Sequence, residues 1–230
     1  MTDSHRIHAC SSPIQSLASR MVDLLNKIDS PSVAFSGGRT PRDLFSLLAA
    51  EYREQVPWSR IKIFQVDERG VPPTHEDSNW RQIQERLLDK ISGINAFRME
   101  AENGEAGAEA YAKILDRELP KNESGVPLID LVLLGMGPDG HTASLFPGTQ
   151  ALEVTDRSVV YNEVPQLDTY RLTLTYPVLQ AAGNRWFLLK GKDKAEMFQQ
   201  VLDGNYPAGK LTDTEWFIDK ELASGLHRQE

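Results

Sequence analysis

Short apolar runs alternate along this chain with longer stretches in which apolar residues recur every three or four positions. The runs are rich in β-branched and aromatic residues, and continuous runs of this kind are typical of strands buried on both faces of a parallel sheet. They predict strands at Ser32–Gly38, Ile61–Glu68, Leu128–Gly137, Ser158–Val164, Tyr170–Tyr176, Arg185–Gly191 and Glu215–Asp219.

The stretches between the runs have the spacing of amphipathic helices. In the first of them, Leu17, Met21 and Leu25 fall on one stripe that can face a sheet. The same spacing predicts helices at Ile14–Ile28, Pro41–Glu54, Asn79–Lys90, Glu105–Leu119 and Lys194–Leu202.

This alternation predicts an α/β fold, a doubly wound, mostly parallel Rossmann-like sheet with helices on both faces. The 230 residues show no internal repeat and no low-complexity linker, so we expect a single domain over residues 1–230. Ligands of such folds bind beyond the carboxyl ends of the strands. Here that rule points to the loops after Phe35, Val66, Leu134 and Leu189.

Composition narrows the classes of function. A net charge of −8 argues against a nucleic-acid partner, because such binding depends on neutralising phosphates. No run approaches the roughly 18 apolar residues of a membrane span, and the first residues lack the apolar segment of a secretory signal. The single cysteine, Cys10, allows no internal disulfide and no cysteine-based metal cluster. We therefore expect a soluble protein of the reducing cytoplasm that has no membrane partner.

The loop after Phe35 reads SGGRTP. Gly37 and Gly38 allow a tight turn and close approach of a ligand to the backbone, and Thr40 would cap the helix that follows. A glycine turn before a helix N-terminus binds anions readily, and Arg39 adds a permanent positive charge. The alternative is an ordinary strand-to-helix turn that carries a surface arginine.

The loop after Val66 begins with a cluster of charged residues that includes Asp67 and Arg69. Arg69 is a second candidate to hold an anion at this edge of the sheet. The alternative is a solvated run of charges beside Ser78 or Asn79, either of which could start the next helix.

The loop after Leu134 reads GMGPDGHTASLFPG and resembles a phosphate loop in two ways. A nucleotide P-loop would need a lysine where this chain has His141. The glycines at 135, 137 and 140 match G-x-G-x-x-G, but that dinucleotide pattern normally follows the first strand of its domain, whereas here it follows the third run. Both patterns are therefore weak evidence for a nucleotide-binding site.

His141 has a second explanation, as a general base. An imidazole exchanges protons near neutral pH, and Asp139 lies close enough in sequence to orient it. Free N–H groups of the glycine turn, Gly137 among them, could stabilise an oxyanion. The alternative is a helix-capping turn with an exposed histidine. Ser144 lacks a G-x-S-x-G elbow, so we expect it to be a helix residue rather than a nucleophile.

The loop after Leu189 places Lys192 and Lys194 at the entry to a helix. Cations are unfavourable at a helix N-terminus unless an anion is present, which makes Lys194 a candidate phosphate ligand. Solvated surface lysines are the alternative. Together, Arg39, Arg69, Lys194 and His141 fit a small phosphorylated substrate and acid–base chemistry.

Five segments, SGGRTP, VDERGVP…SN, GMGPDGHTASLFPG, RLTLTYPVL and GKDKAEMF, resemble the 6-phosphogluconolactonases in order and spacing. That branch belongs to a superfamily that also holds the glucosamine-6-phosphate deaminases. The similarity extends from Ser32 to Asp219, nearly the whole chain. The HTASLFPG segment is the most specific part, since the deaminases continue the same turn with a different sequence.

The resemblance implies hydrolysis of 6-phospho-D-glucono-1,5-lactone to 6-phospho-D-gluconate, a step of the oxidative pentose phosphate pathway. It implies that His141 is the base and that Asp67 and Asp139 orient other groups. The basic positions implied to meet the substrate are Arg39, Arg69, Arg171 and Lys194, and we expect Arg39 and Lys194 to bind its phosphate. The resemblance implies neither a metal nor an organic cofactor, and it implies a monomer.

Two other functions stay open at this point. An isomerase-deaminase acting on amino-sugar phosphates would share the phosphate site but would need a carboxylate base. A sugar-phosphate sensor without catalysis would not need to keep His141.

Overall fold

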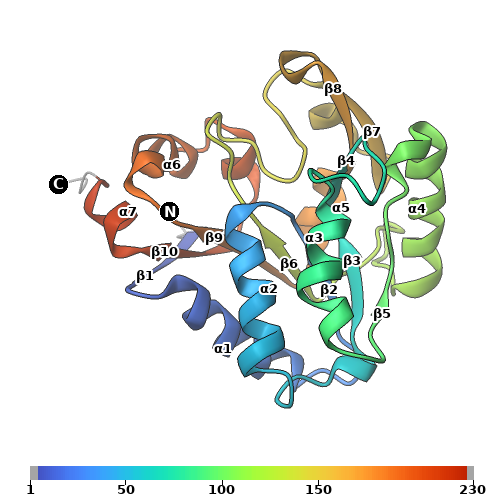
Figure 1. Ribbon diagram of the computed structural model, residues 1–230. Coiled ribbons are helices and arrows are strands. Elements are labelled where there is room, and N and C mark those ends of the chain that lie inside the picture. Colours follow the sequence, from blue (N-terminus) through green and yellow to red (C-terminus); the bar gives the residue numbers. More distant parts are fainter. Residues whose placement is uncertain (1–4, 227–230) are drawn as a thin grey trace.

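The computed structural model describes residues 5–226, which form one seven-stranded sheet, one three-stranded sheet and seven α-helices (Figure 1). The strands are β1 (His5–Cys10), β2 (Ser32–Phe35), β3 (Lys62–Gln65), β4 (Asp67–Arg69), β5 (Asn95–Ala96), β6 (Leu131–Leu134), β7 (Val159–Val164), β8 (Thr169–Leu174), β9 (Asn184–Leu189) and β10 (Thr214–Asp219). The α-helices are α1 (Pro13–Leu25), α2 (Arg39–Glu51), α3 (Asn79–Arg86), α4 (Glu105–Glu118), α5 (Tyr176–Ala181), α6 (Ala195–Leu202) and α7 (Lys220–Ser224).

All neighbours in the large sheet are parallel, in the order β1-β10-β9-β6-β2-β3-β5. From β2 the chain winds outward through β3 to β5, and from β6 it winds the other way through β9 to β10. The winding direction therefore reverses between β2 and β6, and the crevice beside such a reversal is where doubly wound sheets bind ligands.

The central strands β2 and β6 are buried on both faces because helices cover both sides of the large sheet (Figure 1). Val33 and Phe35 of β2 point to one face and pack in a cluster with α1, α2 and α3. Ala34 points to the other face and packs with residues of α4, α5, α6 and α7. The predicted doubly wound α/β fold, with helices on both faces, is confirmed.

The smaller sheet was not predicted. It has the antiparallel order β4-β8-β7, and it uses two segments that the apolar pattern assigned to the parallel sheet, Ser158–Val164 and Tyr170–Tyr176. The predicted strand Ile61–Glu68 divides at Val66, so that β3 stays in the large sheet and β4 joins the small one. Apolar runs mark burial, but they do not say which neighbour pairs with a strand.

Three local predictions were wrong. Thr40 does not cap α2, because the helix begins at Arg39 with Gly38 as its N-cap residue. No helix begins directly after β6, so Ser144 lies in a loop of turns rather than in a helix. His5–Cys10 was not predicted as a strand, because its residues are exposed or half-buried at the sheet edge and form no continuous apolar run. None of the helices in residues 5–226 is long and apolar enough to cross a membrane.

Candidate active site

A cavity of about 590 Å³ opens at the carboxyl ends of β2, β6 and β9, beside the small sheet. Ten of the eleven predicted site residues line it: Gly37, Gly38, Arg39, Thr40, Asp67, Arg69, Gly137, His141, Arg171 and Lys194. The eleventh, Asp139, does not line the cavity but contacts His141. The four strand-end loops and Arg171 of β8 thus converge on one place.

His141 is held in a short turn, residues 135–141, that we name the histidine turn. Its Nδ1 lies 2.5 Å from Oδ1 of Asp139. The ring of Phe146 packs against the imidazole, with 4.0 Å between the ring centroids. Because Nδ1 is engaged by the carboxylate, Nε2 is the nitrogen left to exchange a proton with a ligand.

Two glycines make this turn possible. Gly140 has φ +73°, in the left-handed region that favours glycine. A Cβ on Gly137 would overlap the His141 ring, so any other residue there would displace the imidazole. The N–H of Gly137 donates to the carbonyl of His141 at 2.9 Å. That N–H is therefore engaged within the turn, and Gly137 contributes space beside the imidazole.

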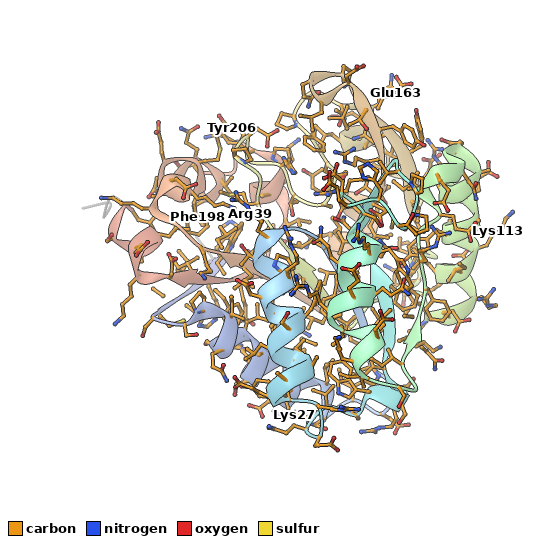
Figure 2. The ribbon with its side chains drawn as sticks, viewed as in Figure 1. Lys27, Arg39, Lys113, Glu163, Phe198 and Tyr206 are labelled. Carbon is orange, nitrogen blue, oxygen red and sulfur yellow. The ribbon has the colours of Figure 1, made fainter. Side chains whose placement is uncertain are left out.

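Arg39 and Lys194 form one basic group in the cavity lining. Arg39 begins α2, and in Figure 2 it lies at the upper end of that helix. Lys194 precedes α6, and its Nζ donates to the carbonyl of Met136 at 3.0 Å, which ties the β9 loop to the histidine turn. Burial lowers the pKa of the Lys194 ammonium; Asp193 opposes that change, and the charge of Arg39 adds to it. A bound anion would offset both the burial of the Lys194 ammonium and its repulsion by the charge of Arg39.

Arg69 and Arg171 form a second basic group, on the small sheet. They are direct partners in the β4–β8 register, so their side chains leave the same face of the small sheet. Nη1 of Arg69 donates to the carbonyl of Asp77 at 2.5 Å, and Nη1 of Arg171 donates to the carbonyl of Tyr170 at 2.9 Å. Burial, followed by the charge of Arg69, lowers the pKa of Arg171. Two positive charges that repel each other in this way favour an anionic ligand between or above them.

Asp67 is fixed from two sides. Its Oδ2 accepts a hydrogen bond from the Ser144 hydroxyl at 2.6 Å, and its backbone carbonyl accepts one from Nδ2 of Asn79 at 2.9 Å. Both partners are buried and line the cavity. Neither Ser144 nor Asn79 was predicted to be a site residue. Ser144 lies 77 positions from Asp67 and Asn79 lies 12 positions from it, and no local pattern predicts either contact.

Glu68, next to Asp67, has a structural task. Its carboxylate accepts from the backbone N–H groups of Arg69, Asn79 and Trp80 and from the side chains of Gln65 and Ser78. Burial raises the pKa of this carboxyl, and the donors oppose that rise. Glu68 thereby fixes the N-terminus of α3, where Ser78 is the N-cap residue, one of the two starts predicted.

Other side chains that the sequence did not single out also line the cavity, including Ser36, Phe146, Leu167 and Lys190. Ser36 stands just before the Gly37 turn, so its place at a strand end was a usable signal. Leu167 comes from the tip of the β7–β8 hairpin, and only the tertiary fold brings it here. In residues 5–226, no group of three or more His, Cys, Asp or Glu side chains is placed to hold a metal ion.

The model of one protein family, the glucosamine-6-phosphate isomerases/6-phosphogluconolactonases, matches residues 6–217. The chain belongs to this family. A 6-phosphogluconolactonase of Streptomyces coelicolor is 34% identical over an alignment of 233 residues, and the match covers 92% of this chain and 88% of the relative. One from a Nostoc species is 36% identical over an alignment of 230 residues, and the match covers 91% of this chain and 94% of the relative.

Solved structures agree with this family membership. The 6-phosphogluconolactonase of Trypanosoma brucei has a TM-score of 0.85 at 27% identity, and the match covers 98% of this chain and all of that one. A monomeric glucosamine-6-phosphate deaminase has a TM-score of 0.73 at 21% identity, covering 96% of this chain and 99% of that one. At that identity the deaminase shows the shared fold alone.

Proposed function

We propose that this protein hydrolyses 6-phospho-D-glucono-1,5-lactone to 6-phospho-D-gluconate, the second step of the oxidative pentose phosphate pathway. The family and its 6-phosphogluconolactonase relatives support a lactone-hydrolysing enzyme. One observation carries the proposal: the Asp139–His141 pair stands at a cavity that is lined by five cationic side chains. A base beside several cations suits a substrate that carries a phosphate and reacts with water.

His141 is the proposed general base. The Asp139 carboxylate accepts Nδ1–H, and Nε2 then takes a proton from water as that water attacks the lactone carbonyl carbon. The tetrahedral intermediate collapses when the bond from that carbon to the ring oxygen breaks. The proton on Nε2 passes to the departing ring oxygen, which becomes a hydroxyl, and the product acid ionises to a carboxylate. His141 ends the cycle neutral.

The two basic groups have separate proposed tasks. Arg39 and Lys194 bind the phosphate, and binding energy from this remote group orients the reacting carbonyl. Arg69 and Arg171 stabilise the oxyanion that forms on the carbonyl oxygen, since the N–H of Gly137 is engaged within the histidine turn. Asp67 orients groups around them and is not the base. This assignment needs no metal ion or organic cofactor.

Further proposals concern the assembly, the location and the partner of the protein. We propose a single-domain monomer of the cytoplasm whose partner is its sugar-phosphate substrate.

The deciding experiment follows hydrolysis of freshly generated 6-phosphogluconolactone against the uncatalysed rate. The wild type should accelerate it, and His141→Ala should lower kcat by roughly 100-fold or more, the usual contribution of a general base. The variant should still bind 6-phosphogluconate. His75→Ala is the matched control, because His75 is exposed and does not line the cavity.

No acceleration by the wild type would overturn the lactonase proposal. Release of ammonia from glucosamine 6-phosphate would then favour the deaminase alternative. Binding of 6-phosphogluconate without any turnover would favour a sensor.

A further inference from the structure

Ser144 contacts all three strands of the small sheet, although it lies outside that sheet, three residues after His141 (strands labelled in Figure 1). Its Oγ–H donates to Oδ2 of Asp67 in β4 at 2.6 Å. Its backbone N–H donates to Oγ1 of Thr173 in β8 at 3.1 Å, and its carbonyl accepts from Nδ2 of Asn162 in β7 at 2.8 Å. Ser144 is 1% exposed, so water does not compete for these hydrogen bonds.

The three partners of Ser144 lie on the same face of the small sheet as the second basic group. Asp67 and Arg69 are two positions apart in β4, so both side chains point to one face. Asp67 pairs directly with Thr173, and Arg69 pairs directly with Arg171. Arg171 in turn pairs with Asn162 of β7. Because directly paired residues share a face, the face that holds Ser144 also carries the two arginines.

The backbone before Ser144 has an unfavourable conformation that local contacts maintain. Ala143 has φ +51°, in the left-handed region that alanine rarely occupies. It lies inside a turn in which the N–H of Leu145 donates to the carbonyl of Thr142 at 2.9 Å. Oγ1 of Thr142 donates to the carbonyl of Gly135 at 2.9 Å, at the start of the histidine turn. Such a conformation persists where contacts on both sides fix it, and here Thr142 and Ser144 supply them.

Asp67 connects the Ser144 hydroxyl with the charges of the second basic group. Burial lowers the pKa of the Arg171 guanidinium, the charge of Arg69 lowers it further, and the Asp67 carboxylate opposes both. Asp67 therefore stabilises the charged form of Arg171, and Ser144 orients the carboxylate that does so.

We infer that Ser144 is a positioning residue: it holds the loop that follows His141 against the small sheet, and so sets the distance between the base and the second basic group. This inference rests on the proposed function, in which His141 activates water while Arg69 and Arg171 stabilise the oxyanion. Both must reach the same carbonyl group, so a change in their spacing lowers kcat.

The first test compares two buried serines that each donate to an aspartate. Ser144→Ala removes the contact with Asp67 and keeps both backbone contacts, so it should lower kcat by roughly tenfold with little change in KM. Ser32→Ala is the matched control. Ser32 is 3% exposed, its Oγ donates to Asp130 Oδ2 at 2.7 Å, and it does not line the cavity. The control should lose thermal stability and keep kcat.

Asn162→Ala tests the same inference from another strand. Asn162 is buried and does not line the cavity, yet its Nδ2 holds the carbonyl of Ser144. Loss of that bond should lower kcat by roughly three- to tenfold at little change in KM. This variant tests the inference independently if Ser144→Ala folds poorly.

A double-mutant cycle separates positioning from a general loss of stability. Arg171→Ala removes one proposed oxyanion donor, so the spacing that Ser144 sets should matter less in that background. Ser144→Ala should therefore lower kcat by a smaller factor in Arg171→Ala than in the wild type. Ser32→Ala should leave kcat unchanged in both backgrounds.

The outcomes separate the inference from the function on which it rests. If the wild type hydrolyses the lactone and Ser144→Ala keeps full kcat, or raises KM instead, the positioning role is wrong and the function stands. Equal factors in the two backgrounds would also overturn that role. A loss as large as that of His141→Ala would favour a nucleophilic serine and overturn it too. No hydrolysis by the wild type would overturn the proposed function itself.

Discussion

The histidine turn and the small sheet bring their side chains to the cavity in opposite ways. The turn joins His141 to Asp139 through contacts that lie within seven consecutive residues. The small sheet pairs Arg69 with Arg171 across about a hundred residues of intervening chain. A proton transfer requires close geometry, which a short turn can hold by itself. An arginine acts over longer distances, so its position can be left to strand pairing.

Damage to the histidine turn should therefore lower kcat, whereas damage to Arg39 or Lys194, the proposed phosphate ligands, should mainly raise KM. Four variants test that division, from the largest expected effect to the smallest.

Gly137→Ala should lower kcat by roughly 100-fold with little change in KM, because the new Cβ overlaps the ring of His141, the proposed base, and displaces it. Steady-state kinetics on the lactone measure both constants. Gly135→Ala is the matched control within the same turn. A Cβ there meets no atom within 4 Å, so His141 should stay in place and the loss of kcat should be much smaller. Wild-type kcat in Gly137→Ala would show that the turn does not position the base.

Arg39→Ala should raise KM by roughly 10- to 100-fold with kcat retained at saturation, the usual size of a lost hydrogen bond to a charged group. Arg42→Ala is the control, because Arg42 is exposed on the same helix and does not line the cavity. A fall in kcat at unchanged KM would instead place Arg39 with the reacting carbonyl.

The lowered pKa of Lys194 predicts how phosphate binding should depend on pH. Burial lowers the pKa of its ammonium, so the positive charge is lost at a lower pH than in an ordinary lysine. Since only the charged form attracts phosphate, affinity for 6-phosphogluconate should weaken as the pH rises through that lowered pKa. The inhibition constant of this stable product, measured across alkaline pH, tests the prediction. Lys194→Arg should remove the dependence, and an unchanged pH profile in that variant would refute it.

Leu167→Ala should have the smallest effect, a rise in KM of roughly three- to fourfold, as expected when a few methyl and methylene groups no longer shield the ligand. Leu167 is 53% exposed at the tip of the β7–β8 hairpin and lines the cavity. Ile7→Ala is the control, because Ile7 is 42% exposed on β1, away from the cavity. An equal effect of both substitutions would show that Leu167 acts through general stability alone.

Much of this arrangement could be predicted from local sequence. Continuous apolar runs identified β2, β6, β9 and β10, and helical spacing identified five of the helices to within a few residues. Four strand-end loops with glycines and charges pointed to one edge of the sheet, and the cavity lies there. These signals are local because burial and turn formation depend on near neighbours.

What the sequence determined by itself was therefore the class of fold, the family resemblance and most of the polar side chains that line the cavity. The tertiary structure alone decided which strands left the parallel sheet, that Ser144 holds Asp67, and that Arg69 pairs with Arg171. The physical reason is the sequence separation between the residues that determine each feature. A turn or an apolar stripe is set by residues a few positions apart, whereas pairing register and the partners of a buried polar atom depend on segments far apart in the chain.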